Sequence, residues 1–267
     1  FNDCFERINS NRDDHMKDVL SSDFINCIST FDGQIWIGTE SAGIVVISPK
    51  LLAVRNFTHD ERIPESIAPN PVNAILADNK GRIWTGNVEA GLSWSLPGSG
   101  VFHHFTTKNS SLVHNSVSAL EYDREGQLWV GTWGGGISLF SLEDMQFTRN
   151  ILATPEIPIS YIGILEYDPV NNYMWIGSNA GVFIYDPVSE EILPVLEEQP
   201  FGSIGACVDD KGRMWLGCQE GLYVFDLYSR KGGAGKDLFS NSVISPGVTY
   251  SDRINCVTIT SDGTLWA

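Results

Sequence analysis

One phrase recurs six times along this chain: a polar turn, a glycine, a short spacer and a tryptophan that follows an apolar residue. The tryptophans that close the six copies are Trp36, Trp84, Trp129, Trp175, Trp215 and Trp266. Successive copies are 48, 45, 46, 40 and 51 residues apart. A period of this length is typical of an array of supersecondary units, so the repeat determines the fold class before any single residue is considered.

Each repeat has the pattern of four short strands. An apolar run such as VNAIL at 72–76 comes first, and a D-x-x-G turn such as Asp78–Gly81 follows it. In such a turn the aspartate bonds the local backbone and the glycine supplies a positive φ. The tryptophan strand, a second glycine-bearing turn, a third apolar strand and a more polar fourth strand complete the unit. The pattern predicts an all-β fold, a β-propeller of four-stranded antiparallel blades, and leaves no room for a helical solenoid.

The chain ends predict an incomplete sixth blade beside five complete ones. We expect residues 1–8 to be the outer strand of a preceding blade and residues 254–267 to supply the first strands of a truncated one. Residues 1–267 would then be a fragment of a propeller. Two closures remain open at this stage. The terminal pieces pair and seal a small ring, or they belong to different blades of a larger one.

Composition excludes several partners. The formal net charge is −16, which repels nucleic acid backbones. No apolar stretch approaches 18 residues, so contact with a membrane is expected only through segments outside this chain. Five cysteines do not suggest a disulfide framework. Cys27 and Cys256 occupy a strand position that small residues fill in other repeats, so we expect both to be buried where blades meet.

The phrase D-x-x-G-x-[IL]-W-[IV]-G-T, most complete at Asp123–Leu139, resembles the two-component regulator propeller repeat. The likeness covers essentially the whole chain and is weakest at Tyr173–Val182, where an insertion puts Asn172 in place of the turn glycine. The resemblance implies a seven-bladed propeller in the periplasmic sensor region of a Bacteroidetes hybrid two-component system. It further implies a homodimeric full-length protein, an oligosaccharide or other small polar ligand, and a histidine kinase outside this chain.

Residues that depart from the repeat are the candidates for ligand binding. The repeated tryptophans alternate with aliphatic residues in strands, which predicts packing between blades. Trp133 is different, because it lies out of register in a glycine-rich turn, TWGGG, between the second and third strands. Together with Trp133, polar residues in the equivalent turns of other repeats are expected to surround a cleft. Their amide and carboxylate groups suit a hydroxyl-rich ligand. These residues are Glu40, Asn87, Glu89, Asn179, Gln219 and Glu220.

No motif indicates catalysis, a metal or a cofactor. His103 and His104 point to opposite faces of an outer strand, and no zinc-ligand spacing accompanies them. The run RKGGAGKD at 230–237 lacks the phosphate-loop spacing. We therefore expect a non-catalytic sensor module with no cofactor. Two alternatives stay open: a scaffold that supports dimerisation and binds no ligand of its own, and a propeller lyase.

Overall fold

The computed structural model describes residues 20, 22, 24–51, 53–69, 71–197, 205–218, 221–226, 240–243, 254, 256–260 and 262–266. Every regular element in these residues is a β-strand. Within the same residues, no helix has the length and apolar character needed to cross a bilayer. The chain divides into two compact units, residues 1–120 and 121–267, which are described separately.

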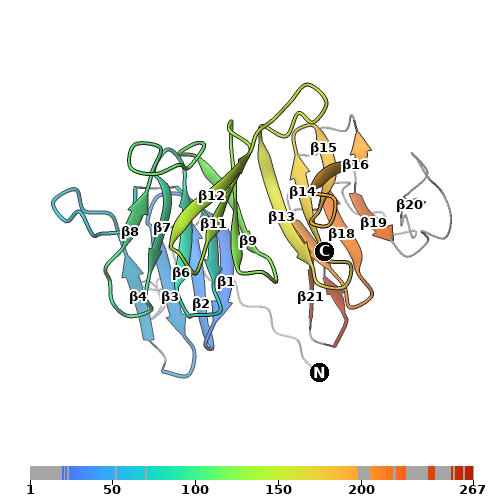
Figure 1. The fold of residues 1–267 in the computed structure, drawn as a ribbon. Coiled ribbons are helices and arrows are strands. Elements are labelled where there is room, and N and C mark those ends of the chain that lie inside the picture. The colour runs from blue at the N-terminus through green and yellow to red at the C-terminus, as the bar shows by residue number, and fades with distance from the viewer. Residues whose placement is uncertain are drawn as a thin grey trace, which may run out of the picture. The chain divides into compact units, whose positions relative to one another are not determined.

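The first unit contains two four-stranded antiparallel sheets, each with its strands in chain order (Figure 1). Blade 1 consists of β1 (Ile25–Phe31), β2 (Gln34–Thr39), β3 (Ile44–Ser48) and β4 (Ala53–Phe57). Blade 2 consists of β5 (Val72–Ala77), β6 (Ile83–Asn87), β7 (Gly91–Ser95) and β8 (His103–Phe105).

Three further four-stranded sheets follow, and only the first strand of blade 3 begins in the first unit. Blade 3 consists of β9 (Val117–Tyr122), β10 (Gln127–Thr132), β11 (Ile137–Ser141) and β12 (Gln146–Ile151). Blade 4 consists of β13 (Ile162–Asp168), β14 (Tyr173–Ser178), β15 (Gly181–Asp186) and β16 (Glu191–Glu197). Blade 5 consists of β17 (Gly205–Val208), β18 (Arg213–Cys218), β19 (Gly221–Asp226) and β20 (Ser240–Val243). The short strands β21 (Thr258–Ile259) and β22 (Leu265–Trp266) form a two-stranded sheet.

Five four-stranded antiparallel blades confirm the prediction of an all-β propeller. The sheet of β21 and β22 lies where a further blade was expected to begin, between residues 254 and 267. Residues 1–8 lie outside the described residues. The division of the incomplete blade between the two ends and the seven-bladed size therefore stay predictions.

The repeated tryptophans pack between blades, as predicted for the core. Trp36 of blade 1 is 2% exposed and clusters with Val72 and Ile83 of blade 2. Trp175 of blade 4 is fully buried and clusters with Phe225 of blade 5. A ring of this size removes about 150–250 Å² from water, so the tryptophans are a main source of the adhesion between blades. Trp266 is an exception.

Trp266 is 54% exposed, contrary to the expectation for the repeated tryptophans. Among the described residues, no complete blade follows it to cover the ring. Cys256 is likewise exposed rather than buried. Cys27 fits the expectation better, because it is partly buried and its thiol lies 3.8 Å from the carbonyl oxygen of Val72 in the next blade.

The turn aspartate joins the turn to the tryptophan in three blades. In blade 2, Oδ1 of Asp78 accepts hydrogen bonds from the backbone N–H groups of Lys80 and Arg82, while Oδ2 accepts one from Nε1 of Trp84 at 2.9 Å. The same arrangement recurs at Asp123 with Trp129 and at Asp209 with Trp215. The spacing between aspartate and tryptophan thus satisfies a buried indole N–H, which is costly to leave unpaired.

Two blades depart from this arrangement, and both leave the indole nitrogen without a partner. Blade 1 has a two-residue turn, Asp32–Gly33, in which both residues have positive φ. Blade 4 has a longer turn, in which Asn172 takes the positive φ that glycine supplies elsewhere. The buried Nε1 atoms of Trp36 and Trp175 have no hydrogen-bond partner. The sequence irregularities in these two copies therefore have a direct structural effect.

A glycine two residues after the tryptophan allows the next blade to come close. A Cβ atom built on Gly86 would lie 2.5 Å from Cγ1 of Val117, in the first strand of blade 3. A Cβ atom on Gly38 would lie 2.5 Å from the sulfur of Cys27 and 3.0 Å from Cγ1 of Val72, in the first strand of blade 2. The contact at Gly86 forces a backbone shift, because the neighbouring group is a branched side chain close to its own backbone.

We expect Gly86→Ala to lower the free energy of unfolding by about 1–3 kcal/mol through overpacking. Urea unfolding of the variant measures the loss. In a Val117→Ala background the same substitution should cost clearly less, because the clashing Cγ1 atom is gone. An equal loss in both backgrounds would contradict the proposed contact.

Candidate functional site

The out-of-register tryptophan lies on an exposed surface of blade 3. Trp133 is 43% exposed and follows β10. Its backbone forms an isolated antiparallel bridge with Tyr161, which precedes β13 and is 54% exposed. Bridge partners place their side chains on the same face with Cβ atoms about 4.5–5.5 Å apart. Two large aromatic side chains therefore share one exposed face.

Backbone hydrogen bonds hold this loop in place. The N–H groups of Gly134 and Gly136 both donate to the carbonyl oxygen of Ser160, at 2.8 and 3.3 Å. The N–H of Asn179, in the turn after β14, donates to the carbonyl oxygen of Tyr161 at 3.1 Å. We call Trp133, Tyr161 and Asn179 the aromatic rim patch. It brings together two of the residues that the sequence singled out, Trp133 and Asn179.

Tyr161 was not among the predicted site residues. It lies directly before an apolar strand run, in a connection that the repeat pattern does not cover. Only the bridge between consecutive blades brings it beside Trp133. The one available signal was an aromatic residue at the start of a strand, and that signal is also typical of core positions.

In the first unit, Glu40 belongs to a chain of polar side chains. Asn26 donates from Nδ2 to Oε2 of Glu40 at 3.0 Å and to Oδ1 of Asn73 at 3.4 Å. Nδ2 of Asn73 is buried and has no partner. Asn26 and Asn73 occupy the same position in the first strands of their blades, a pattern present in the runs INCI and VNAI. The sequence analysis did not use that pattern.

The remaining predicted residues have different surroundings. Asn87 is fully buried, and its amide donates to the carbonyl oxygen of Pro69 at 2.9 Å, so its side chain holds a loop rather than lining a surface. Glu89 is exposed in a turn with a φ of 57°, and its N–H donates to the hydroxyl of Ser116. Gln219 and Glu220 lie outside the described residues.

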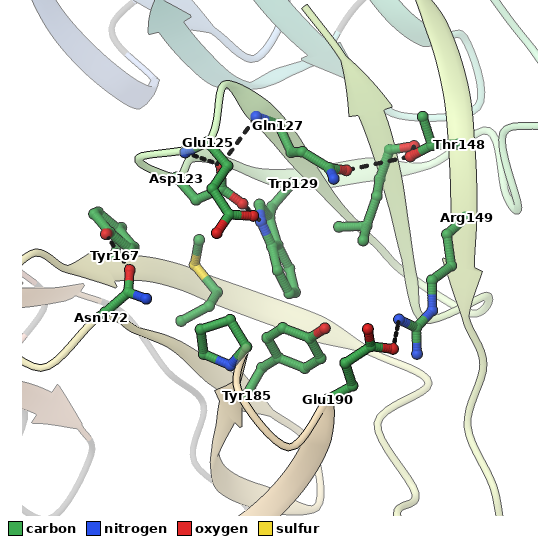
Figure 2. Close-up of a pocket in the computed structure, with 13 residues that line it drawn as sticks. Asp123, Glu125, Gln127, Trp129, Thr148, Arg149, Tyr167, Asn172, Tyr185 and Glu190 are labelled. Carbon is green, nitrogen blue, oxygen red and sulfur yellow. Dashed lines mark hydrogen bonds and ion pairs between the residues drawn. The ribbon is translucent and has the colours of Figure 1, made fainter.

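A separate cleft lies between blades 3 and 4 (Figure 2). Its lining includes Gln127, at the start of β10, whereas Trp133 follows the end of that strand. Its volume is about 320 Å³. The lining residues come from the turn between β9 and β10, from strands β10–β15, and from the turns that follow β13 and β15: Asp123, Glu125, Gln127, Trp129, Leu139, Thr148, Arg149, Tyr167, Asn172, Met174, Tyr185, Pro187 and Glu190. None of these was predicted as a site residue. We call this region the inter-blade cleft.

Neither region contains a recognisable catalytic or metal-binding arrangement. Among the described residues, no group of three or more His, Cys, Asp or Glu side chains could hold a metal ion. The aromatic rim patch presents flat apolar rings, and the polar chain in the first unit presents amide and carboxylate groups. These are the groups that bind hydroxyl-rich molecules.

The fold and the turn chemistry together define a β-propeller built from tryptophan repeats. Residues 111–134 match the family model described as two component regulator propeller, which confirms the resemblance at that repeat. No curated protein sequence matches this chain significantly.

Solved structures with a similar fold include the extracellular domains of two proteins from B. thetaiotaomicron, each described as a hybrid two component system. The first is 17% identical with a TM-score of 0.74, and the match covers 95% of this chain and 33% of that one. The second is 20% identical with a TM-score of 0.70, covering 91% and 31%. Virginiamycin B lyase from Staphylococcus aureus is 13% identical with a TM-score of 0.68, covering 91% and 76%. At these identities the likeness shows the fold alone, and the chain spans about a third of the length of the two B. thetaiotaomicron domains.

Proposed function

We propose that this chain is part of the periplasmic sensor region of a two-component signalling protein, and that it binds a carbohydrate-type ligand without transforming it. The match of residues 111–134 to the regulator propeller model supports the signalling role. The similar folds of two extracellular domains support the location outside the cytoplasm. The kinase that receives the signal, and the segments that attach the protein to the membrane, lie outside these 267 residues.

The exposed pair of Trp133 and Tyr161 is the observation that carries the ligand assignment. Most large aromatic rings in the described residues are buried or partly buried, whereas these two are 43% and 54% exposed on one face. The C–H face of a sugar ring is apolar and packs on an aromatic ring, while its hydroxyl groups bond to amides. Asn179, exposed beside Tyr161, supplies such an amide.

Signalling requires that the ligand bind one arrangement of the full-length protein more tightly than another. In a homodimer, a ligand on this patch would bias the arrangement of the two propellers and so act on the kinase. A scaffold that only supports dimerisation would use the same exposed aromatic surface for protein contact. The two roles predict different losses when the rings are removed: ligand binding for the sensor and dimerisation for the scaffold.

We expect Trp133→Ala and Tyr161→Ala in the full-length protein to weaken oligosaccharide binding at least about tenfold each, since burying an aromatic ring contributes about 1.5–3 kcal/mol. A panel of neutral oligosaccharides identifies the probe, and calorimetric titration measures its affinity. Val188→Ala is the matched control, because Val188 is 91% exposed on a distant turn of blade 4. Unchanged sugar affinity with a loss of dimerisation would support the scaffold role and overturn the proposal.

A further inference from the structure

The inter-blade cleft has an apolar floor made of buried aromatic rings. Trp129 and Tyr185 meet edge to face with ring centroids 5.0 Å apart, and they are 2% and 8% exposed. Leu139 and Met174 complete the floor. The floor is therefore apolar, and it offers the apolar part of a ligand a hydrophobic surface of limited area.

The mouth of the cleft is acidic. Glu125 and Glu190 are exposed at its edge, and Asp123 lies deeper (Figure 2). Arg149 is the one basic residue in the lining, and it pairs with Glu190 at 3.0 Å. Three carboxylates therefore face one guanidinium. Because the ion pair is exposed, it contributes little and opens readily.

The inner polar groups are mostly committed to other partners. Asp123 accepts from the Trp129 indole and from the backbone of its own turn. Oε1 of Gln127 accepts from the Thr148 hydroxyl, and the Tyr167 hydroxyl donates to Asn172 at 2.6 Å. Burial raises the pKa of the Tyr185 hydroxyl, which also feels the charges of Arg149, Glu190 and Glu125. Glu125 and Glu190 are thus the acidic groups at the exposed mouth, and Glu190 becomes available to a ligand when its ion pair with Arg149 opens.

From this geometry we propose that the inter-blade cleft binds a small organic cation, a protonated amine carried on a compact apolar body. The apolar part fills the floor over Trp129 and Tyr185, and the ammonium group lies between the carboxylates of Glu125 and Glu190. A negatively charged ligand meets more carboxylates than guanidinium groups at the mouth and is repelled. The site is independent of the aromatic rim patch and of the ligand proposed there, because it lies at the other end of the blade.

Three probes of one shape test the charge preference in the full-length protein. We expect benzylamine to bind with a dissociation constant of about 1 mM, as for a ligand of so few atoms. Benzyl alcohol should bind about fivefold more weakly, since each exposed ion pair contributes up to about 1 kcal/mol, and benzoate should not bind measurably. Titration calorimetry at low salt gives all three values. Equal binding of benzylamine and benzyl alcohol would overturn the proposal.

Variants with opposite expected effects locate the site. Glu190→Gln should weaken benzylamine binding about threefold or more, because it removes a carboxylate and leaves Arg149 unpaired. Arg149→Gln should strengthen it, because Glu190 becomes free for the ligand. Glu143→Gln, at an exposed acid outside the cleft, should change nothing. A general disturbance of the fold would weaken binding in both cleft variants, so changes of the same sign would also overturn the proposal.

Discussion

Replacing Asp78 by alanine is expected to lower the free energy of unfolding by about 3–5 kcal/mol, a large part of the total stability of a domain. The Asp78 side chain is fully buried, and Arg82 donates to it from Nε at 2.5 Å. Burial alone raises the pKa of Asp78, but hydrogen bonds from Trp84 and Arg82 outweigh that effect and hold the pKa below its usual value. The substitution removes the carboxylate that accepts from a buried guanidinium and from a buried indole N–H.

Asp60→Ala is the matched control in the same unit. Asp60 also pairs with an arginine, Arg62, at 2.7 Å, but the arginine side chain is 87% exposed. Removing this exposed carboxylate should cost far less stability than removing Asp78. Chemical unfolding followed by tryptophan fluorescence compares the two variants. Equal losses would show that the turn aspartate has no special role in joining the turn to the tryptophan.

The second large effect concerns two partly buried glutamates, Glu121 on β9 and Glu166 on β13, in the first strands of blades 3 and 4. Burial is the main cause that raises the pKa of Glu121 to about 7 and the pKa of Glu166 to about 8. The charge of Glu121 raises the pKa of Glu166 further. The backbone N–H of Val208 in blade 5 acts in the opposite direction but does not offset burial.

These raised pKa values make stability fall as pH rises. An unfolded glutamate titrates near 4.5, so the folded state binds more protons than the unfolded state between about pH 4.5 and pH 8. The contribution of Glu166 is fully present below pH 4.5 and is lost as the pH passes through about 8. The free energy of unfolding falls because the charged form of Glu166 is less well solvated inside the protein than in water.

Glu166→Gln should therefore stabilise the protein at pH 8 by roughly 2–3 kcal/mol relative to its effect at pH 5. Urea unfolding at both pH values gives the difference directly. The exposed Glu143→Gln serves as the control and should show the same small effect at each pH. An effect of Glu166→Gln that does not depend on pH would contradict the burial of a charge at this position.

The blades could be predicted from the sequence because their determinants are local. The alternation around each tryptophan, the turn aspartates and the turn glycines all act within about ten residues. Even the irregular turn at Asn172 was recognisable, and that residue adopts the positive φ expected of the glycine it replaces. The inward position of most repeated tryptophans follows from the same alternation.

The candidate site was only partly predictable, because it depends on which blades meet. A polar turn residue can be exposed like Asn179 or buried like Asn87, and the difference comes from a carbonyl group 18 residues earlier in the chain. Tyr161 reaches Trp133 only through contact between two blades. The inter-blade cleft has the same origin, since residues of two repeats line it and neither repeat marks it alone.

The unpartnered indoles of Trp36 and Trp175 bear on how such repeats can diverge. Burying a tryptophan contributes about 4–6 kcal/mol from its area, whereas leaving its N–H unpaired costs about 1–3 kcal/mol. A blade can therefore lose the hydrogen bond between its turn aspartate and its tryptophan and still adhere to its neighbour. Turn length can then change by insertion or deletion, while the tryptophan side chain is retained. Loops on that edge of the fold can acquire new shapes one blade at a time, without each change requiring compensation elsewhere.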